Sequence, residues 1–288
     1  MKAMLIDSTR CIGCRSCQVA CKQWNGLEAE VTKNLPSQKN EVPTFEDLGY
    51  QNPRGLSAKT WTLMTFTEFE VNNQMQWVFN KKQCMHCGVD AGEDRNKWPS
   101  CVVSCPVQAL EKTKEGPVIW HNDRCIGCRY CMLACPFQVP KFEWDSVWPK
   151  IRKCTMCYDR LTQGSEGVNE PACSKACPTD AIMTGEREDM LREAHSRINA
   201  FPDKYYDQVY GENELGGTCV LHLSSVPLGK LGYPENLPQE SLAGTTSTAM
   251  KGLPYFITAL SLGMIGIYTA RRNKIESELK ESEGKSNG

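Results

Sequence analysis

Net charge is almost absent from this sequence. Its 33 lysine and arginine residues are balanced by 34 aspartate and glutamate residues, which leaves a formal charge of -1 over 288 residues. Proteins that bind nucleic acid or an acidic surface carry a clear excess of positive charge. The balance therefore excludes nucleic acid and acidic surfaces as expected partners.

An export signal is also missing from the amino terminus. Residues 1–7 run directly into a cysteine motif, without the basic region and the apolar stretch that a signal peptide contains. Taken alone, this start predicts a cytoplasmic protein.

Cysteine, in contrast, is abundant. Sixteen of the 17 cysteines fall into four motifs that share the ending C-x3-C, and the first and third motifs read C-x2-C-x2-C-x3-C without interruption. A proline follows the last cysteine of every motif except the first, as in the cysteine runs of bacterial ferredoxins. The four motifs are Cys11, Cys14, Cys17 and Cys21; Cys84, Cys87, Cys101 and Cys105; Cys125, Cys128, Cys131 and Cys135; and Cys154, Cys157, Cys173 and Cys177.

This spacing is typical of the ligands of 4Fe-4S clusters. A short loop can supply three thiolates to one cluster, and in two-cluster ferredoxins the last cysteine of each run binds the neighbouring cluster. Because a hairpin-sized segment separates the second motif from the third, these two are expected to pair, which leaves the first motif to pair with the fourth. We therefore predict four 4Fe-4S clusters. Their ligands are Cys11, Cys14, Cys17 and Cys177 at site A; Cys21, Cys154, Cys157 and Cys173 at site B; Cys84, Cys87, Cys101 and Cys135 at site C; and Cys105, Cys125, Cys128 and Cys131 at site D.

Two other uses of the cysteines remain open at this point. Disulfides need an oxidising compartment and are most frequent in small domains that lack a sufficient core. Zinc is the stronger alternative for the fourth motif, because two cysteine pairs about fifteen residues apart resemble a zinc ribbon. The remaining cysteine, Cys219, lies outside every motif and is expected to be a small buried residue.

Basic residues are frequent beside the motifs. Either they offset the negative charge of the clusters, which would raise the reduction potentials, or they belong to an ordinary solvated surface. The residues in question are Arg15, Arg124, Arg129, Arg152, Lys153 and Lys175.

One apolar segment near the carboxyl terminus is long enough to cross a membrane. Residues 253–270 carry no charge, and eighteen helical residues extend over about 27 Å, close to the hydrocarbon thickness of a bilayer. Residues 251–272 are therefore predicted to be a single-pass anchor in the cell inner membrane. More positive charge follows this segment than precedes it, so we expect the tail in the cytoplasm and the cluster domain in the periplasm. The positive residues are Lys251 before the segment and Arg271, Arg272, Lys274, Lys280 and Lys285 after it.

A periplasmic cluster domain needs an explanation when no export signal is visible. We expect a partner subunit that bears a twin-arginine signal to carry the folded chain across the membrane. Such a route is compatible with cofactors that are inserted before export.

The sequence predicts an α+β fold that consists of two fused ferredoxin-like units, each with two 4Fe-4S clusters. Residues 1–24 and 144–185 form the first unit, which is discontinuous, and residues 82–143 form the second. Residues 25–81 are an insertion with a β-hairpin region. A single transmembrane helix completes the fold at the carboxyl end.

Smaller elements can be placed by periodicity. Apolar and polar residues alternate over residues 60–70, and residues 76–79 form a plausible return strand of the inserted hairpin. Residues 186–250 are expected to contain an amphipathic helix over 186–200, followed by an irregular extension rich in glycine, proline and tyrosine. The charged tail, residues 273–288, is expected to be frayed or disordered.

Several segments together resemble the iron-sulfur (beta) subunits of membrane-bound respiratory formate dehydrogenases, which belong to the four-cluster subunits of molybdopterin oxidoreductases. The likeness extends over most of residues 1–270. The segments that carry it are IDSTRCIGCRSCQVACKQWN (6–25), GLSAKTWTLMTF (55–66), CMHC (84–87), DRCIGCRYCMLACPFQVPK (123–141), KCTMCYDR (153–160) and EPACSKACPTDAI (170–182).

The resemblance implies that this chain is an electron-transfer subunit and has no catalytic site of its own. A molybdopterin subunit with molybdenum or tungsten would oxidise formate, and the electrons would cross the four clusters to a membrane cytochrome b and on to quinone. The thirteen residues between Cys87 and Cys101 depart from the family pattern, which usually has far fewer there. The same architecture serves complexes that reduce sulfur compounds or dimethyl sulfoxide, and hydrogenase complexes. A zinc-cysteine scaffold without redox chemistry is the alternative from a different class.

Overall fold

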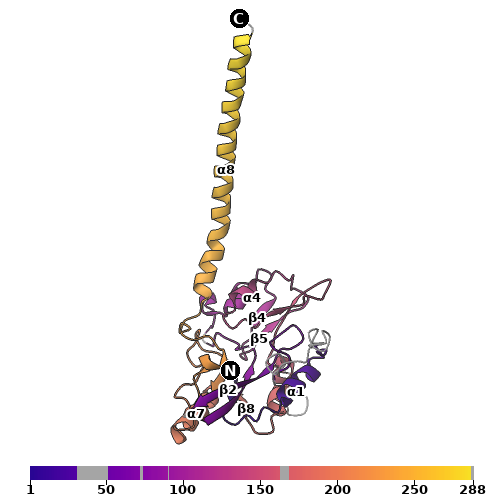
Figure 1. Cartoon of the computed structure of the whole chain (residues 1–288), viewed down its shortest axis with the longest axis vertical. Coiled ribbons are helices and arrows are strands. Elements are labelled where there is room, and N and C mark those ends of the chain that lie inside the picture. The colour runs from indigo at the N-terminus through magenta and orange to yellow at the C-terminus, as the bar shows by residue number, and fades with distance from the viewer. Residues whose placement is uncertain (31–50, 72–73, 90, 163–168, 287–288) are drawn as a thin grey trace. The chain divides into compact units, whose positions relative to one another are not determined.

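The computed structural model of the chain describes residues 1–30, 51–71, 74–89, 91–162 and 169–286. The chain forms two compact units, Met1–Gly244 and Thr245–Gly288. The first unit contains short strands and helices, and every cysteine of the sequence lies in it (Figure 1). The second unit belongs to one long helix.

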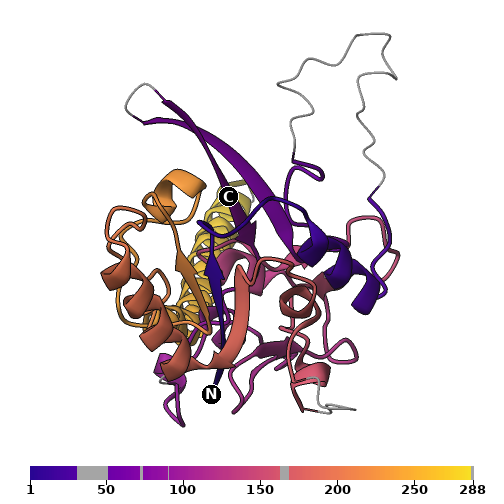
Figure 2. The ribbon, with the colours of Figure 1, turned by 90° about the horizontal axis from the view of Figure 1, so that it is seen from below.

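The amino-terminal strand is the middle strand of a three-stranded sheet. β1 (Lys2–Asp7) pairs with β8 (Ile182–Glu186) in antiparallel orientation and with β9 (Val220–Leu223) in parallel orientation. Ile6 lies opposite Ile182, so the start of the chain runs beside the segment that follows the fourth cysteine motif (Figure 2). The sheet therefore brings the first and fourth motifs to the same end of these two strands.

One helix covers a face of this sheet. α7 (Arg187–Ala200) follows β8 directly and buries Met190, Ala194 and Ile198, which recur every fourth residue and so share one side of the helix. These residues pack against leucines of β1 and β9 in one hydrophobic cluster. The amphipathic helix predicted over residues 186–200 is confirmed.

The strand β9 lies where the sequence predicts an irregular extension. All four of its residues are buried, so it lacks the alternation of apolar and polar residues that marks a half-buried strand. One of the four is a histidine, His222, which is only 1% exposed. A short strand with a buried polar residue leaves no periodic signal in the sequence.

Four short helices near the cysteine motifs pack in two pairs. α1 (Ser16–Trp24) contacts α6 (Ala172–Lys175), and α3 (Ser100–Val103) contacts α4 (Tyr130–Ala134). The first pair joins the first motif to the fourth, and the second pair joins the second motif to the third. The ligand sets predicted for sites A to D rest on this same pairing.

Two small antiparallel strand pairs flank the third motif. They are β4 (Leu110–Lys112) with β5 (Val118–Trp120), and β6 (Lys141–Phe142) with β7 (Ile151–Arg152). The pairs hold the chain on both sides of the loop that carries three predicted ligands of site D. The other short elements of the first unit are η2 (Arg95–Lys97), α5 (Tyr158–Thr162) and η4 (Leu228–Leu231).

The longest strand pair precedes the second motif. β2 (Leu63–Val71) and β3 (Gln74–Lys82) are antiparallel and form the long twisted ribbon that is visible in Figure 2. The rings of Phe66 and Phe79 meet edge to face, with 5.2 Å between their centroids, and pack against the core cluster that contains Cys17. The pair therefore forms part of the wall beside the first motif. Residues 31–50 of the predicted insertion lie outside the described residues.

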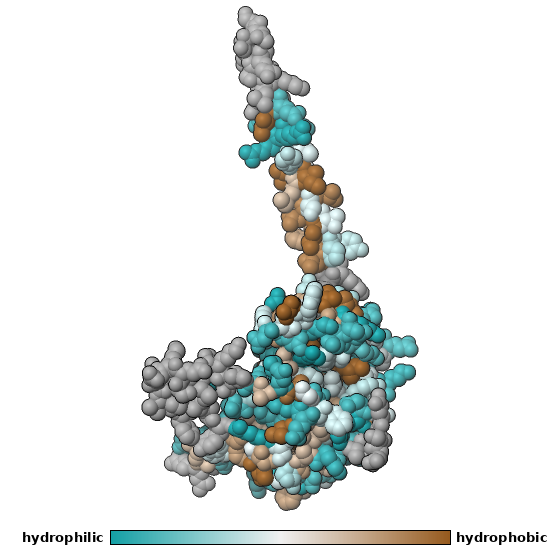
Figure 3. All heavy atoms as spheres, turned by 90° about the vertical axis from the view of Figure 1, so that its right-hand side faces the viewer, coloured by the Kyte–Doolittle hydropathy of each residue, from teal (hydrophilic) through white to brown (hydrophobic). Residues whose placement is uncertain are grey.

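The carboxyl-terminal helix is α8 (Ala243–Ser286), 44 residues long. Its segment Gly252–Glu276 is long and apolar enough to cross a membrane, and the most apolar eighteen residues of the segment have a mean hydropathy of 1.4 and are not buried by the rest of the described chain. Figure 3 shows hydrophobic side chains along this part of the helix and hydrophilic ones beyond it. A candidate membrane helix at the predicted place is therefore present.

The charged tail is helical, which differs from the predicted frayed segment. α8 continues through the tail to Ser286. Arg272 Nε lies 2.8 Å from Glu276 Oε1, an i,i+4 ion pair of the kind that supports exposed helices. The many glutamate and lysine residues that follow are also good helix formers, so charge alone does not stop the helix here.

Candidate metal centres

The first and third motifs form loops of the same shape. Gly13 and Arg15 in the first motif have φ angles of 67° and 63°, and Gly127 and Arg129 in the third have φ angles of 70° and 67°. These left-handed residues curl the chain between cysteines at matching positions, and glycine adopts such angles without strain. The two loops therefore present their first three cysteines in the same manner.

The second and fourth motifs share another feature of the backbone. His86 and Met156, each just before the second cysteine of its motif, both have left-handed φ angles, 51° and 56°. The turn after each cysteine-proline pair is also repeated, since Gln108, Gln138 and Asp180 have φ angles between 49° and 53°. The four motifs thus fold as two kinds of loop, each kind used twice.

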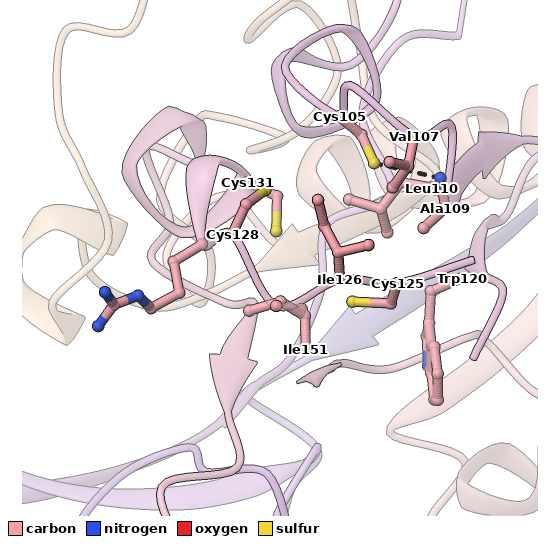
Figure 4. A pocket seen from close by; sticks show the side chains of 12 residues that line it. Cys105, Val107, Ala109, Leu110, Trp120, Cys125, Ile126, Cys128, Cys131 and Ile151 are labelled. Carbon is pink, nitrogen blue, oxygen red and sulfur yellow. Dashed lines mark hydrogen bonds between the residues drawn. The ribbon is translucent and has the colours of Figure 1, made fainter. Parts of the chain in front are cut away.

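Site D has the clearest boundary. Cys105, Cys125, Cys128 and Cys131 line one cavity that is partly open to solvent. Figure 4 shows their sulfur atoms facing a common space that apolar side chains also border. The backbone N–H of Ala109 donates a 3.1 Å hydrogen bond to Cys105 Sγ, as expected for a thiolate ligand. The four predicted ligands of site D therefore lie together, although Cys105 comes from another motif than the rest.

An unpaired donor at this cavity supports a sulfur-rich occupant. Trp120 lines the cavity, and its Nε1 is buried with no hydrogen-bond partner among the described residues. A buried N–H without an acceptor costs free energy, so native proteins rarely leave one. The sulfide sulfurs of a cluster are acceptors. The four thiols and this indole N–H together fit a 4Fe-4S cluster.

Site A is a second cavity. Cys11, Cys14, Cys17 and Cys177 line it, together with Lys81. Three of the thiols come from the loop after β1 and the fourth from the segment before β8. The pairing of these two strands accounts for their approach.

Sites B and C lie deeper, and their thiols can be grouped through electrostatics. At site B, burial raises the pKa of Cys157 to about 12, to which the neighbouring Cys173 and Cys21 thiols contribute, while a hydrogen bond from the Ala172 N–H opposes the shift. The pKa of Cys154 is likewise raised by burial and by Cys21. The thiols predicted for site B are therefore neighbours.

At site C the same relationship holds for the other set. Burial raises the pKa of Cys87 well above its ordinary value, and the thiols of Cys84, Cys135 and Cys101 raise it further. Metal binding requires thiolates, which an apolar interior disfavours unless a cation accompanies them. The buried thiols are consistent with sites that hold iron.

Single thiols also interact across neighbouring sites. One such pair joins site A to site B, another joins B to C, and a third joins C to D, so the four groups form a row. The pairs are Cys17 with Cys173, Cys154 with Cys84, and Cys101 with Cys131.

The alternatives of zinc and disulfides receive no support from this geometry. All 17 cysteines have free thiols. Within the described part of the chain, no three or more His, Cys, Asp or Glu side chains are placed to hold a single metal ion. A zinc site needs four ligand atoms within about 2.3 Å of one centre, and the described residues of the fourth motif show no such arrangement.

Cys219 is buried apart from the four sites, as predicted. It is 0% exposed, and its Sγ lies 3.2 Å from the carbonyl oxygen of Gly116 and 3.3 Å from Lys112 Nζ. It is a packing residue of the core.

The basic residues beside the motifs have different environments. The Lys175 side chain is 65% exposed, whereas Lys153 is 1% exposed. Arg15 and Arg129 lie over aromatic rings, at 4.8 Å from the Phe66 centroid and 5.3 Å from the Phe142 centroid. Neither a solvated surface nor a buried countercharge describes the whole group.

A second buried lysine was not singled out from the sequence. Lys81 is also 1% exposed, although the next residue, Lys82, is half-buried. The signal was present, because alternation along β3 places Lys81 on the same side as Phe79, which packs beside site A. The predicted return strand ended at residue 79 and so stopped short of it.

Comparison with known proteins agrees with this geometry. A family profile for 4Fe-4S dicluster domains matches residues 75–187, and one for 4Fe-4S binding domains matches residues 2–23. The formate dehydrogenase-O iron-sulfur subunit of Escherichia coli K12 is 38% identical over 240 residues, which cover 81% of this chain and 71% of the relative. The formate dehydrogenase iron-sulfur subunit of Haemophilus influenzae is 32% identical over 271 residues, which cover 92% of this chain and 77% of the relative.

The chain belongs to the family of formate dehydrogenase iron-sulfur subunits. It is therefore a 4Fe-4S protein of the electron-transfer type. The chain is also similar to a protein of another kind of complex. The hydrogenase-2 operon protein HybA of Escherichia coli O157:H7 is 34% identical over 254 residues. That match covers 81% of this chain and 72% of the relative.

Proposed function

We propose that this chain relays electrons through four 4Fe-4S clusters, from a formate-oxidising molybdopterin subunit with molybdenum or tungsten to a membrane cytochrome b and quinone. The observations that support the proposal are the two cavities lined by the cysteines predicted for sites A and D, and the close approach of the buried thiols predicted for sites B and C. The names of the relatives supply formate as the electron source.

Each bound cluster supplies a centre that accepts and releases one electron. The chain's own residues would hold it with the four thiolates predicted for each of sites A to D. Residues 1–24 and 144–185 would enclose A and B as one ferredoxin-like unit, residues 82–143 would enclose C and D as the other, and residues 25–81 would be inserted between them.

The row of interacting thiols supports the order A, B, C, D for the path. Adjacent sites share a pair of neighbouring cysteines at each step, and the middle step joins the two ferredoxin-like units through Cys154 and Cys84. An electron that enters at one end would pass every site before it leaves at the other.

Placement in the membrane follows from charge. We propose that residues 251–272 anchor the chain in the inner membrane, with the cluster domain in the periplasm and the tail in the cytoplasm. Protease added to spheroplasts should then cleave the cluster domain, whereas protease added to inverted vesicles should cleave only the tail. The reverse pattern would contradict the orientation.

Metal analysis of the purified complex tests the relay. The wild-type chain should contain about sixteen iron and sixteen acid-labile sulfide, four of each per cluster. Cys128→Ala should reduce the iron to about twelve and slow electron transfer from formate to quinone, while formate oxidation by an artificial dye persists. Cys219→Ala is the matched control and should keep all the iron, because Cys219 lies outside the four sites. Zinc with little iron would support a scaffold instead.

A hydrogenase complex is the second candidate, and the similarity to HybA favours it. The electron donor distinguishes the two. Formate should reduce the clusters in the purified complex and hydrogen should not, whereas the opposite result would assign the chain to a hydrogenase.

A further inference from the structure

Two lysine side chains are buried where lysine is rarely found. Lys81 and Lys153 are each 1% exposed and are the two largest fully buried side chains of the described chain. Burial of an ammonium group costs several kcal/mol unless charges or hydrogen bonds compensate. Both residues therefore need a partner that favours positive charge.

The contacts of Lys153 match those of a charged ammonium. Its Nζ donates to the carbonyl oxygen of Cys154 at 2.8 Å and to that of Val118, and it lies 3.9 Å from Cys84 Sγ. An ammonium has three protons to donate, and here three acceptors surround it. Cys84 belongs to site C and Cys154 to site B, so this charge lies between the two.

Lys81 has the same relation to the preceding pair of sites. Its Nζ donates to Gln83 Oε1, and its side chain lines the cavity of site A. It also interacts electrostatically with Cys21, Cys154 and Cys173, three predicted ligands of site B. This second charge therefore lies between A and B.

We propose that Lys81 and Lys153 set the reduction potentials of the sites on either side of them, an inference that rests on the proposed function. Reduction adds one electron to a site whose thiolates already make it negative, while no bond forms or breaks. A fixed positive charge stabilises the reduced form more than the oxidised form and so raises the potential. Neither water nor salt screens these two charges, because both are buried.

The positions of the two lysines determine which sites should change in reduction potential. Site B has a buried lysine on each side, and sites A and C have one each. At site D the electrostatic neighbours of Cys131 are the thiols of Cys105, Cys128 and Cys125. Removal of one lysine should therefore change two potentials of the four, and the potential of D should not change.

The test is a redox titration of the intact, detergent-purified complex with dithionite, followed by electron paramagnetic resonance. The variants are Lys81→Met and Lys153→Met, which keep the length of the side chain and remove its charge. Lys82→Met is the matched control. Lys82 adjoins Lys81 on β3, but its Nζ donates to the Gly232 carbonyl oxygen and no thiol contributes to its pKa.

We expect Lys81→Met to lower the midpoint potentials of two clusters, those of sites A and B. Lys153→Met should lower those of sites B and C, so a single cluster responds to both variants. At a fixed potential the ratio of reduced to oxidised cluster should fall about tenfold, which corresponds to about 59 mV for one electron. Lys82→Met should leave all four midpoints at their wild-type values. Unchanged midpoints in both lysine variants, or an equal shift of all four components, would overturn the proposal.

A second variant covers the case in which a lysine variant loses iron. Gln83→Glu keeps the shape of the side chain that already accepts from Lys81 Nζ and neutralises the ammonium with a carboxylate. It should lower the same two midpoints as Lys81→Met, and an absence of any shift would contradict the role of Lys81. The number of clusters in the wild type, from iron analysis and paramagnetic signals, separates the proposed relay from the role of the lysines. Fewer than four clusters in the wild type would contradict the relay. Four clusters whose midpoint potentials do not change in the lysine variants would contradict only the role of the lysines.

Discussion

Asp7 and Arg197 form a buried ion pair although 190 positions separate them, with 2.8 Å between Oδ2 and Nη1. The Asp7 side chain is 0% exposed, and the Arg197 side chain is 11% exposed. Tyr205 Oη donates to the same carboxylate oxygen at 2.8 Å, and Thr9 donates to the other through both its N–H and its hydroxyl. The Asp7 carboxylate thus links α7, through Arg197, to the end of β1, just before the first cysteine loop.

Loss of this charge should destabilise the first unit. Asp7→Asn removes one of two carboxylates that pair with the Arg197 guanidinium, and the pair with Glu193 remains. The loss should therefore stay below the cost of an unpaired buried charge, about 3–5 kcal/mol. We expect the complex to melt at a lower temperature, and the loss of the visible absorbance of the clusters measures this melting. Asp123→Asn is the matched control, because Asp123 also precedes a compact cysteine motif but is exposed. Equal melting temperatures for the two variants would show that the pair contributes nothing.

Two glycines at matching positions should respond differently to alanine. Both Gly13 and Gly127 have left-handed φ angles, which cost a non-glycine residue about 1–2 kcal/mol. A Cβ at Gly127 would also meet the Pro149 carbonyl oxygen at 2.5 Å, whereas a Cβ at Gly13 would meet only the rings of Phe66 and Phe79, at 3.0 Å or more.

Backbone cannot give way as a side-chain ring can, so Gly127→Ala should disturb site D more than Gly13→Ala disturbs site A. We expect Gly127→Ala to lose about four of sixteen iron atoms per chain, one cluster's content. Gly13→Ala should lose clearly less. Iron analysis of both purified variants measures these losses. A greater loss of iron in Gly13→Ala than in Gly127→Ala would contradict the argument that the backbone contact at Gly127 is the more severe one.

Stability should fall in mild acid because burial lowers the pKa values of two histidines, His86 and His222. Burial, and secondarily the charge of Lys81, lower the pKa of His222 to about 3, below its ordinary value near 6.5. The unfolded chain therefore binds a proton at a higher pH than the folded chain does. The stabilisation by neutral His222 is complete above pH 6.5 and is lost progressively as the pH falls toward 3.

Between pH 7.5 and 5.5 this linkage amounts to about 1.4 kcal/mol. His222→Gln removes one of the two titrating histidines and should make this part of the pH profile shallower by that amount. Chemical unfolding of both proteins at the two pH values measures the difference. An identical pH dependence in wild type and variant would mean that His222 is not the group responsible.

The anchor should be separable from the cluster domain. A chain that stops after Gly244 retains the compact unit Met1–Gly244 and all 17 cysteines. Expressed without partner subunits, it should appear in the soluble fraction with the same iron content per chain as the full-length protein. The full-length chain should stay in the membrane through a carbonate wash. Retention of the truncated chain in washed membranes would point to a second membrane contact.

The sequence was most informative where the signal is local. A short loop presents cysteines with two residues between them to one site, and the hairpin-sized segment between the second and third motifs predicted which motifs would meet. The helix α7 and the apolar part of α8 could also be predicted from the sequence. In α7 apolar residues recur every fourth position, and in α8 they continue over many residues. These features need no knowledge of the rest of the chain.

Features that depend on distant partners left no such signal. Asp7 reads as an ordinary residue at the end of a strand until Arg197 is placed beside it. β9 is a strand because β1 offers it a free edge, and its four buried residues do not alternate. Lys81 is an intermediate case: its type alone would place it on the surface, the alternation along β3 places it beside Phe79, and the thiols around it explain why a lysine can be buried there.

The pairing of β1 with β8 also separates the cavities of sites A and D in time. The cavity lined by Cys11 and Cys177 cannot exist in a nascent chain that has not yet reached residue 177. Every residue that lines the cavity of site D lies between Cys105 and Ile151. During translation, all the residues around the site in the middle of the polypeptide are therefore synthesised before the set around the site beside the amino terminus is complete.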